Sequence, residues 1–427
     1  MTLETAEKNR VNQILLCAMV LGLLLRLIIA FSYPGFLSDL NLYRNWAIQG
    51  AKDLWGIYYQ KAPPDYPPLY LYILAGVGKA IRSLTDPSQT QLHYVLIKLP
   101  SMIFDLLLIA VVLSFAKGRR QGQKALFAAL LLLFNPVLII NSSLWGQTDA
   151  FYGCFVLLFL LGMARERFTL MMVSFGLLVL FKPTGLFLLP VVILEWMTQL
   201  RSKRGRDLLK AGIKSLFLCL AIILPFLITM GLPWLISLYV GGAKKYGYAS
   251  QRAPNLMVLL EGDLKPDSSL LPGGLSYLNL SIILLALFGM FFAGLYFRYP
   301  QSLAKPALLL LWFSGIYMLS VRMHERYNYV QILLAAVCMV IYKERRFLGL
   351  FTALSVIASV NHFSLVYFSN HQETRALWLP FLERLTIFLA LLNMLAFLAT
   401  IYITVYQLKC LPADGLNRSN QQSTKAG

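Results

Sequence analysis

The chain has 427 residues, of which 58% are hydrophobic and only 13% are charged, and its mean hydropathy is +0.65. Soluble domains carry about a quarter charged residues, so this composition excludes an ordinary soluble protein and predicts a polytopic membrane protein. The formal net charge of +19 lies mostly in short loops between apolar runs. Because the positive-inside rule gives cytoplasmic loops this distribution, we expect no nucleic-acid partner.

Apolar runs suited to crossing a bilayer recur along the whole chain. They predict one all-α transmembrane bundle over residues 1–410, with no internal repeat and no soluble domain. The polar tail at 411–427 is expected to be disordered and cytoplasmic. A span needs about 20 apolar residues, or fewer where the helix is buried among others, which gives about twelve spans. They are expected at 13–33, 94–116, 124–142, 148–164, 169–181, 185–200, 211–230, 275–297, 305–320, 329–342, 347–368 and 380–406.

The order of basic and polar loops predicts the face of the membrane that each loop occupies. Acidic residues precede the first apolar run, which favours a retained span over a cleaved signal and places the N-terminus inside. The basic loops at 117–124, 165–167, 201–214 and 343–346 then fall on the cytoplasmic side. The external face receives the first external loop, 34–93, and the segments 143–147, 182–184, 231–274, 321–328 and 370–378.

The stretch QKAPPDYPPLYLYILAGV, residues 60–77, lies in this first external loop. Its apolar part is too short for a span and is closed by Lys79 and Arg82. Proline is tolerated at the start of a helix because the first helical N–H groups lack partners in any case. We therefore expect an interfacial or re-entrant helix that begins at the prolines.

Charges and cysteines also occur inside the predicted spans. Arg26 and Asp105 are each surrounded by apolar residues, and we expect them to form a structural ion pair, because an unpaired charge in the membrane is costly. The cysteines are dispersed without the spacing of a disulfide framework or of metal ligands, so we predict neither. They are Cys17, Cys154, Cys219, Cys338 and Cys410.

Five external segments each bring a carboxylate, a cation or an amide to one face: 38–46, 65–70, 144–149, 181–185 and 322–329. Each has a structural alternative. Asp39 is in a position to cap the following helix, and Asp65 to fix the proline turn. Trp145 suits an interfacial aromatic belt, and Lys182 and Arg326 suit snorkelling to head groups.

These residue types favour sugar transfer from a lipid-linked sugar phosphate without a metal or cofactor. A carboxylate deprotonates the acceptor hydroxyl, and cations stabilise the departing lipid phosphate. Asp39-Leu40-Asn41 lacks the second acid of a DxD pair. We predict Asp39 as the catalytic base, facing the same cavity as His324. Donor phosphate binding is assigned to Lys182, Arg322, His324 and Arg326, and substrate contact or support to Tyr43, Asp65, Tyr66, Trp145, Gln147, Asp149 and Glu325.

The external motifs also resemble known families. SDLNLYRNW followed by DYPPLY is similar to the first external loop of the dolichyl-phosphate-glucose-dependent glucosyltransferases. LWGQTDAFY and FKPTGLFLLP resemble the GPI mannosyltransferases that act on the second mannose and their bacterial relatives, and MHERY resembles both sets. This resemblance implies a GT-C hexosyltransferase that moves mannose or glucose, with inversion, from a polyprenyl- or dolichyl-phosphate donor at the extracytoplasmic face. It implies Asp39 as base and His324 on the donor phosphate.

Other functions stay open at this point. A transporter or flippase of lipid-linked sugars would have inverted repeats and broken helices meeting at mid-membrane, which the sequence does not show. Composition also allows a non-enzymatic scaffold or a protein like the O-antigen ligases. Short loops without an extended lumenal domain favour a bacterial inner-membrane protein, acting on a lipid-linked or glycan acceptor.

Overall fold

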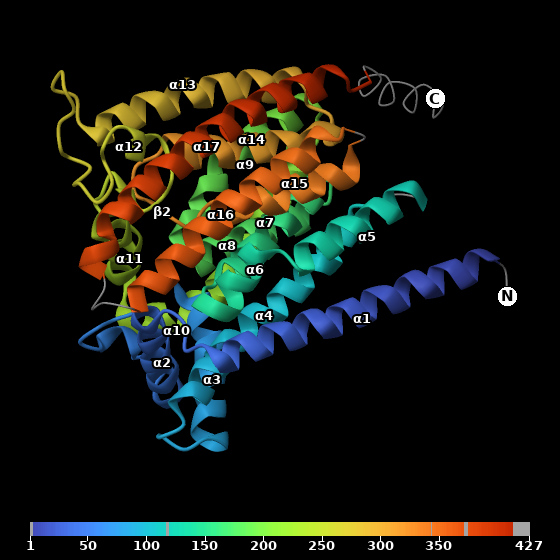
Figure 1. The fold of residues 1–427 in the computed structure, drawn as a ribbon. Helices are drawn as coiled ribbons and strands as arrows, with labels where there is room; N and C mark the ends of the chain where they lie inside the picture. Colours follow the sequence, from blue (N-terminus) through green and yellow to red (C-terminus); the bar gives the residue numbers. More distant parts are fainter. Residues whose placement is uncertain (1–2, 117–118, 343, 371–374, 413–427) are drawn as a thin grey trace.

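The computed structural model describes residues 3–116, 119–342, 344–370 and 375–412, which fold into a bundle of helices (Figure 1). The two termini lie at the same end of the bundle. Helices α13 and α17 run along one side and α1 along the other, with α7, α14 and α15 between them. The predicted disordered tail, 411–427, lies outside the described residues except for its first two positions.

The elements follow one another as in the order below, with two-residue strands as the β structure of the described chain. They are α1 (Leu3–Ser32), α2 (Leu37–Lys52), η1 (Ile57–Tyr59), α3 (Pro68–Leu84), α4 (Thr90–Ser114), α5 (Arg119–Leu133), α6 (Pro136–Ile139), η2 (Ile140–Trp145), α7 (Asp149–Ala164), α8 (Phe168–Phe181), η3 (Pro183–Leu188), α9 (Leu189–Arg201), α10 (Gly205–Met230), α11 (Leu232–Lys245), β1 (Ser250–Gln251), α12 (Leu256–Leu259), α13 (Tyr277–Arg298), η4 (Ser302–Ala304), α14 (Lys305–Leu319), β2 (Met323–His324), α15 (Tyr329–Ile341), α16 (Arg346–Asn370) and α17 (Arg375–Lys409).

The predicted all-α membrane fold is confirmed, but the predicted number of spans is not. Helical structure lies at all of the predicted span positions. Within the described residues, however, only 8 helices are long and apolar enough to cross a membrane, or 9 if the bent pair formed by α5 with α6 and η2 is one span. Helices α7, α8 and α15 are shorter: a helix of 13 residues, such as α15, is about 20 Å long, against about 30 Å for the hydrocarbon core. Nearly every residue of α15 is buried, so protein rather than lipid surrounds it.

The bend in that pair, 45°, follows from Asn135 and Pro136. Proline ends the preceding helix and suits the first turn of the next one, where its missing N–H needs no partner. The Asn135 side chain accepts a hydrogen bond from the Val137 N–H at 2.9 Å and caps the new segment. The segment then widens into a π-helix, η2, and stops at Gly146, whose φ of 87° suits glycine. The bend and the stop thereby set the position of the residues 147–149 that follow.

The first external loop contains two closely packed helices, α2 and α3. Helix α3 begins at Pro68, as expected from the proline motif, and it is not one of the candidate spans. A Cβ at Gly78 would lie 1.8 Å from the Ala47 carbonyl oxygen, so glycine allows the two helices to touch. The helix itself is therefore confirmed, and its place at the membrane interface stays a prediction.

The expected ion pair between Arg26 and Asp105 is confirmed. Arg26 Nε lies 2.9 Å from Asp105 Oδ2, and both side chains are fully buried. Asp105 also accepts hydrogen bonds from Ser142 Oγ at 2.7 Å and Tyr329 Oη at 3.0 Å. Because an intramembrane charge is costly unless it is paired and hydrogen-bonded, this cluster joins α1, α4, η2 and α15 inside the bundle.

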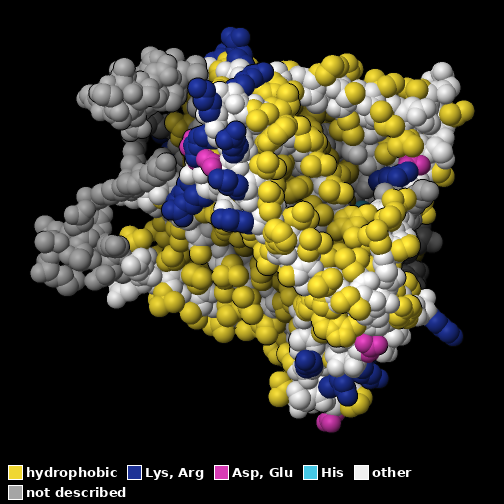
Figure 2. Space-filling view, turned by 180° about the vertical axis from the view of Figure 1, so that it is seen from behind, with side chains coloured by type: hydrophobic (Ala, Val, Ile, Leu, Met, Phe, Trp, Pro, Cys, Tyr) yellow, Lys and Arg dark blue, Asp and Glu magenta, His cyan; other side chains and the backbone are white. Residues whose placement is uncertain are grey.

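The surface agrees with a membrane protein. Figure 2 shows a broad hydrophobic face across the middle of the molecule. Lys and Arg side chains gather on that face at the end nearer the two termini, and a smaller group lies at the tip of the molecule below. A band of apolar side chains between charged ends is the pattern that a bilayer requires.

Candidate functional site

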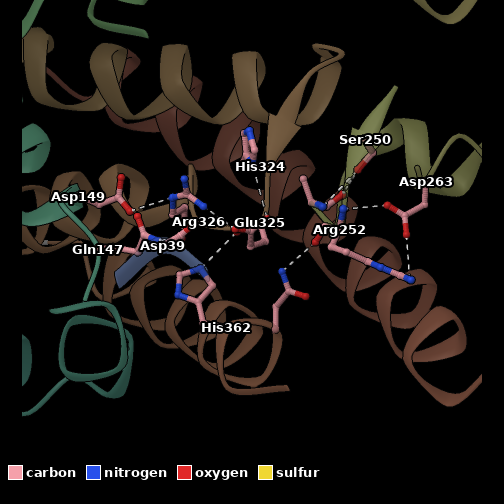
Figure 3. A network of polar contacts seen from close by, with 12 residues as sticks. Asp39, Gln147, Asp149, Ser250, Arg252, Asp263, His324, Glu325, Arg326 and His362 are labelled. Carbon is pink, nitrogen blue, oxygen red and sulfur yellow. Dashed lines mark hydrogen bonds and ion pairs between the residues drawn. The ribbon is translucent and has the colours of Figure 1, made fainter. Parts of the chain in front are cut away.

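The structure brings all of the predicted external segments together at one end of the bundle. Gln147 Nε2 donates a hydrogen bond to Asp39 Oδ2 at 2.5 Å, which joins the turn before α7 to α2. Lys182 Nζ contacts Asp149 Oδ1 at 2.8 Å, and Arg326 Nε lies 3.6 Å from Asp149 Oδ2. Segments that lie far apart in the sequence therefore form one polar cluster, part of which is drawn in Figure 3.

A cavity of about 400 Å³ lies against this cluster. All of the residues predicted to bind a phosphate line it, namely Lys182, Arg322, His324 and Arg326. Asp65 and Tyr66 of the proline motif also line it, together with the apolar side chains of Leu186, Phe187 and Leu278. A smaller pocket of about 20 Å³, beside Lys182 and Arg326, reaches Phe313 and Val330 in the bundle. The larger cavity thus has a basic, aromatic wall and an apolar wall.

Lys182 and Arg326 are buried and paired, so the snorkelling alternative is wrong for both. Burial by itself would lower the pKa of Lys182, but the neighbouring Asp149 carboxylate raises that pKa above its usual value. Burial would raise the pKa of Glu325, whereas a hydrogen bond from His324 and the charge of Arg326 lower it to about 2. Arg326 Nη1 lies 2.7 Å from Glu325 Oε1. Both cations therefore stay charged, and Arg326 bridges two carboxylates.

Arg322 and His324 reach the cavity from the segment that contains β2. Strand β2 pairs in parallel with β1, with Ser250 opposite Met323 and Gln251 opposite His324, so the loop after α11 is tied to this motif. Arg322 has a φ of 62°, a left-handed conformation that costs energy for a residue with a side chain, and its Nε lies 2.6 Å from Asp267 Oδ2. The ring of His324 lies 5.0 Å from that of Tyr246.

Asp39 lies in a different place from the one predicted. It is in the first turn of α2, while Phe36 occupies the N-cap position, so it does not cap the helix. It is half-buried and is not among the residues that line the larger cavity, in contrast to His324, so the expectation that both face one cavity is wrong. In Figure 3 the Asp39 carboxylate points to Gln147, near Arg326. The physical reason is the Gln147 hydrogen bond, which holds the carboxylate on the inner side of the cation. The assignment of Asp39 as a base stays a prediction.

The remaining predicted residues support the site or line it. Trp145 is buried beside Phe36 and beneath Arg326, whose guanidinium lies 5.8 Å from the Trp145 ring, so it is not an exposed belt residue. Asp65 is more than a turn residue, because its Oδ2 accepts a hydrogen bond from Tyr246 Oη at 3.2 Å at the cavity wall. The Tyr43 and Tyr66 hydroxyls lie 3.3 Å apart inside the cluster.

Several residues of the site were missed from the sequence. His362 Nε2 lies 3.2 Å from the Glu325 carbonyl oxygen, and Tyr246 joins Asp65 to the ring of His324. Asn141 Nδ2 donates to Asp149 Oδ2 at 2.9 Å. His362 and Asn141 are polar residues inside apolar runs, and this was the signal that could have indicated them.

The model of one protein family, described as GPI transamidase subunit PIG-U, matches residues 56–270. The matched part contains Asp65, Tyr66, the turn before α7 and Lys182, and it ends before the segment with His324. No curated protein sequence matches the chain.

This match corrects the function expected from the sequence. A GPI transamidase subunit is not a hexosyltransferase, so the prediction of a hexosyltransferase enzyme is wrong. The match does support a multi-pass membrane protein, in agreement with the apolar helices. The motifs that resembled GT-C enzymes are instead explained here by the cluster they build around Lys182 and Arg326.

Proposed function

Because the chain belongs to the PIG-U family of polytopic membrane proteins, we propose that it is a membrane-embedded subunit that binds a phosphate-linked lipid sugar. The phosphate group would lie in the cavity of about 400 Å³, on the wall formed by Lys182, Arg322, His324 and Arg326. The family description, a subunit of a transamidase, supports a role within a larger assembly. The observation that carries the proposal is the convergence of these basic residues from two distant segments on one cavity.

The hydrogen-bonding capacity of Arg326 supports a phosphate ligand. Its Nε is buried and has no hydrogen-bond partner among the described residues, although it lies 3.6 Å from Asp149 Oδ2. A buried donor without a hydrogen bond is costly, and a phosphate oxygen is an acceptor of suitable strength. The carboxylates of Asp149 and Glu325 hold the guanidinium in place at the cavity wall. Arg326 is thereby pre-organised for an anion.

The apolar wall supports a lipid as the carrier of that phosphate. Leu186 lies at the start of the segment 183–201, and Leu278 lies in the first turn of α13, and both segments are candidate spans. Leu186 is 42% exposed. A prenyl chain attached to the phosphate would therefore have an apolar path along these helices into the bilayer, while the tyrosines of the cavity would contact the sugar.

A binding measurement with matched variants tests this proposal. The protein is reconstituted in nanodiscs and titrated with polyprenyl-phosphate mannose and polyprenyl-phosphate glucose, followed by native mass spectrometry. Arg322→Gln removes a cavity cation, and charge-assisted contacts contribute about 1.5–3 kcal/mol, so Kd should rise about ten- to a hundredfold. Arg252→Gln is the control, because Arg252 forms a similar loop ion pair with Asp263 at 3.0 Å but does not line the cavity. Equal effects of the two variants would contradict the proposal.

A further inference from the structure

Asp39 has no contact with the cavity, yet a chain of hydrogen bonds joins it to a residue that does. We infer that Asp39 is a positioning residue for the ligand, acting through Gln147 and Tyr43 on Tyr66. This inference rests on the binding function proposed above and deepens it, because it assigns a role in ligand recognition to a carboxylate outside the cavity. Tyr66 lines the cavity, and Lys182 Nζ lies 5.7 Å from the centre of its ring.

The contacts run from Asp39 to the cavity wall without a gap. Gln147 Nε2 donates to Asp39 Oδ2 at 2.5 Å, and Tyr43 Oη donates to Gln147 Oε1 at 3.4 Å. The hydroxyls of Tyr43 and Tyr66 lie 3.3 Å apart, and that of Tyr66 lies 3.3 Å from Thr148 Oγ1. Gln147 and Thr148 are fully buried, and both tyrosines are buried, so the chain is closed within protein.

The Asp39 carboxylate determines the direction of this chain. A carboxylate accepts hydrogen bonds, so the amide of Gln147 turns its NH₂ group to Asp39 and its oxygen to Tyr43. The single hydroxyl hydrogen of Tyr43 is then used on Gln147, and Tyr43 has only acceptor capacity left for Tyr66. Tyr66 therefore donates to Tyr43 and accepts from Thr148. One carboxylate thus selects one arrangement for the whole buried network.

An asparagine at position 39 would remove that selection. Its side chain offers both a donor and an acceptor, so Gln147 could face it in either orientation and the hydroxyls of Tyr43 and Tyr66 could reverse. Tyr66 is the last member before the cavity and lies beside the cation Lys182, which Asp149 also holds. A loss of fixed geometry at Tyr66 therefore weakens the preformed site, although no residue that lines the cavity has changed.

The test is a double-mutant cycle on ligand affinity. Kd for polyprenyl-phosphate mannose is measured in nanodiscs for Asp39→Asn, Tyr43→Phe and the double variant. Each single variant should raise Kd about three- to tenfold, the range of one hydrogen bond. The double variant should raise it no further, because both changes interrupt one chain. Tyr43→Phe keeps the ring and its packing, and unfolding temperatures are compared for all variants.

The control is Asp53→Asn, which makes the same chemical change at the other end of α2, where Asp53 Oδ1 accepts from the Gly56 N–H at 3.0 Å. It should leave Kd unchanged. Additive effects of Asp39→Asn and Tyr43→Phe, or an unchanged Kd in Asp39→Asn while Arg322→Gln still weakens binding, would overturn only the positioning role. Absence of saturable binding by the wild-type protein would overturn the proposed function and this inference with it.

Discussion

Lys182 Nζ lies 2.8 Å from Asp149 Oδ1, and the two side chains are only 7% and 6% exposed. The pair joins the end of α8 to the start of α7 at the wall of the cavity. Removal of one partner from such a pair leaves a buried charge without compensation, which costs far more than the loss of a surface ion pair.

Lys182→Met should therefore destabilise the protein by about 3–5 kcal/mol, whereas Lys182→Met combined with Asp149→Asn should recover most of that loss. The measurement is equilibrium unfolding in mixed detergent. Lys265→Met is the control: Lys265 pairs with Glu261 at 3.9 Å on the surface, and its loss should cost less than about 1 kcal/mol. If the single Lys182 variant were as stable as the control, the buried pair would not have the energetic role assigned to it.

The pH dependence of stability should show the low pKa of Glu325. Its folded-state pKa of about 2 lies below the ordinary value of 4.5, so the stabilisation by this carboxylate is complete above pH 4.5 and is lost as the pH falls towards 2. The stability difference between wild type and Glu325→Gln should stay constant from pH 7 to about pH 5 and shrink only below that. A difference that already shrinks between pH 7 and 6 would exclude a lowered pKa at this residue.

The contact between α2 and α3 can be tested at two glycines of one helix. A Cβ at Gly78 would lie 1.8 Å from the Ala47 carbonyl oxygen, so Gly78→Ala should force the helices apart and destabilise the protein by about 1–3 kcal/mol. Gly76→Ala is the matched control, because a Cβ there meets nothing within 4 Å. It should be neutral or stabilise the helix by up to about 1 kcal/mol. Thermal unfolding of the two variants distinguishes a steric contact from a general effect of glycine.

The topology predicts that residues 34–93 lie outside and 117–124 inside. Single cysteines at Ser83 and Gln121, in a background without the native cysteines, are exposed to a membrane-impermeant thiol reagent in intact cells. Labelling is expected at position 83 and, only after the membrane is permeabilised, at position 121. The reverse order of labelling would invert the whole bundle.

Much of the fold followed from local sequence signals. Apolar runs set the positions of the helices, Pro68 marked the start of α3, and the lone charges Arg26 and Asp105 paired as expected. The span count did not follow, because α15 is as apolar as a lipid-facing helix but is buried by protein. Hydropathy measures the preference for an apolar environment and does not distinguish lipid from protein as that environment.

The site was also only partly predictable. Residue types identified the cations, since a basic cluster at the end of a span is costly without an anion, and the structure gathers Lys182, His324 and Arg326 at one cavity. The position of Asp39 depended on Gln147, a contact between residues 108 positions apart, which no local pattern contains. The activity was misjudged because the motifs describe the residues of a binding site and not the reaction that it serves.

The central claim is that the cavity beside Arg322, His324 and Arg326 binds the phosphate of a lipid-linked sugar. The most direct test compares two ligands that differ only in this group, polyprenyl-phosphate mannose and the polyprenyl mannoside without phosphate, titrated into the wild-type protein in nanodiscs. The proposed function predicts saturable binding of the phosphate-containing lipid and at least about tenfold weaker binding of the other, as expected for the loss of one or more charge-assisted hydrogen bonds. Equal affinity for the two lipids, or no saturable binding of either, would contradict it.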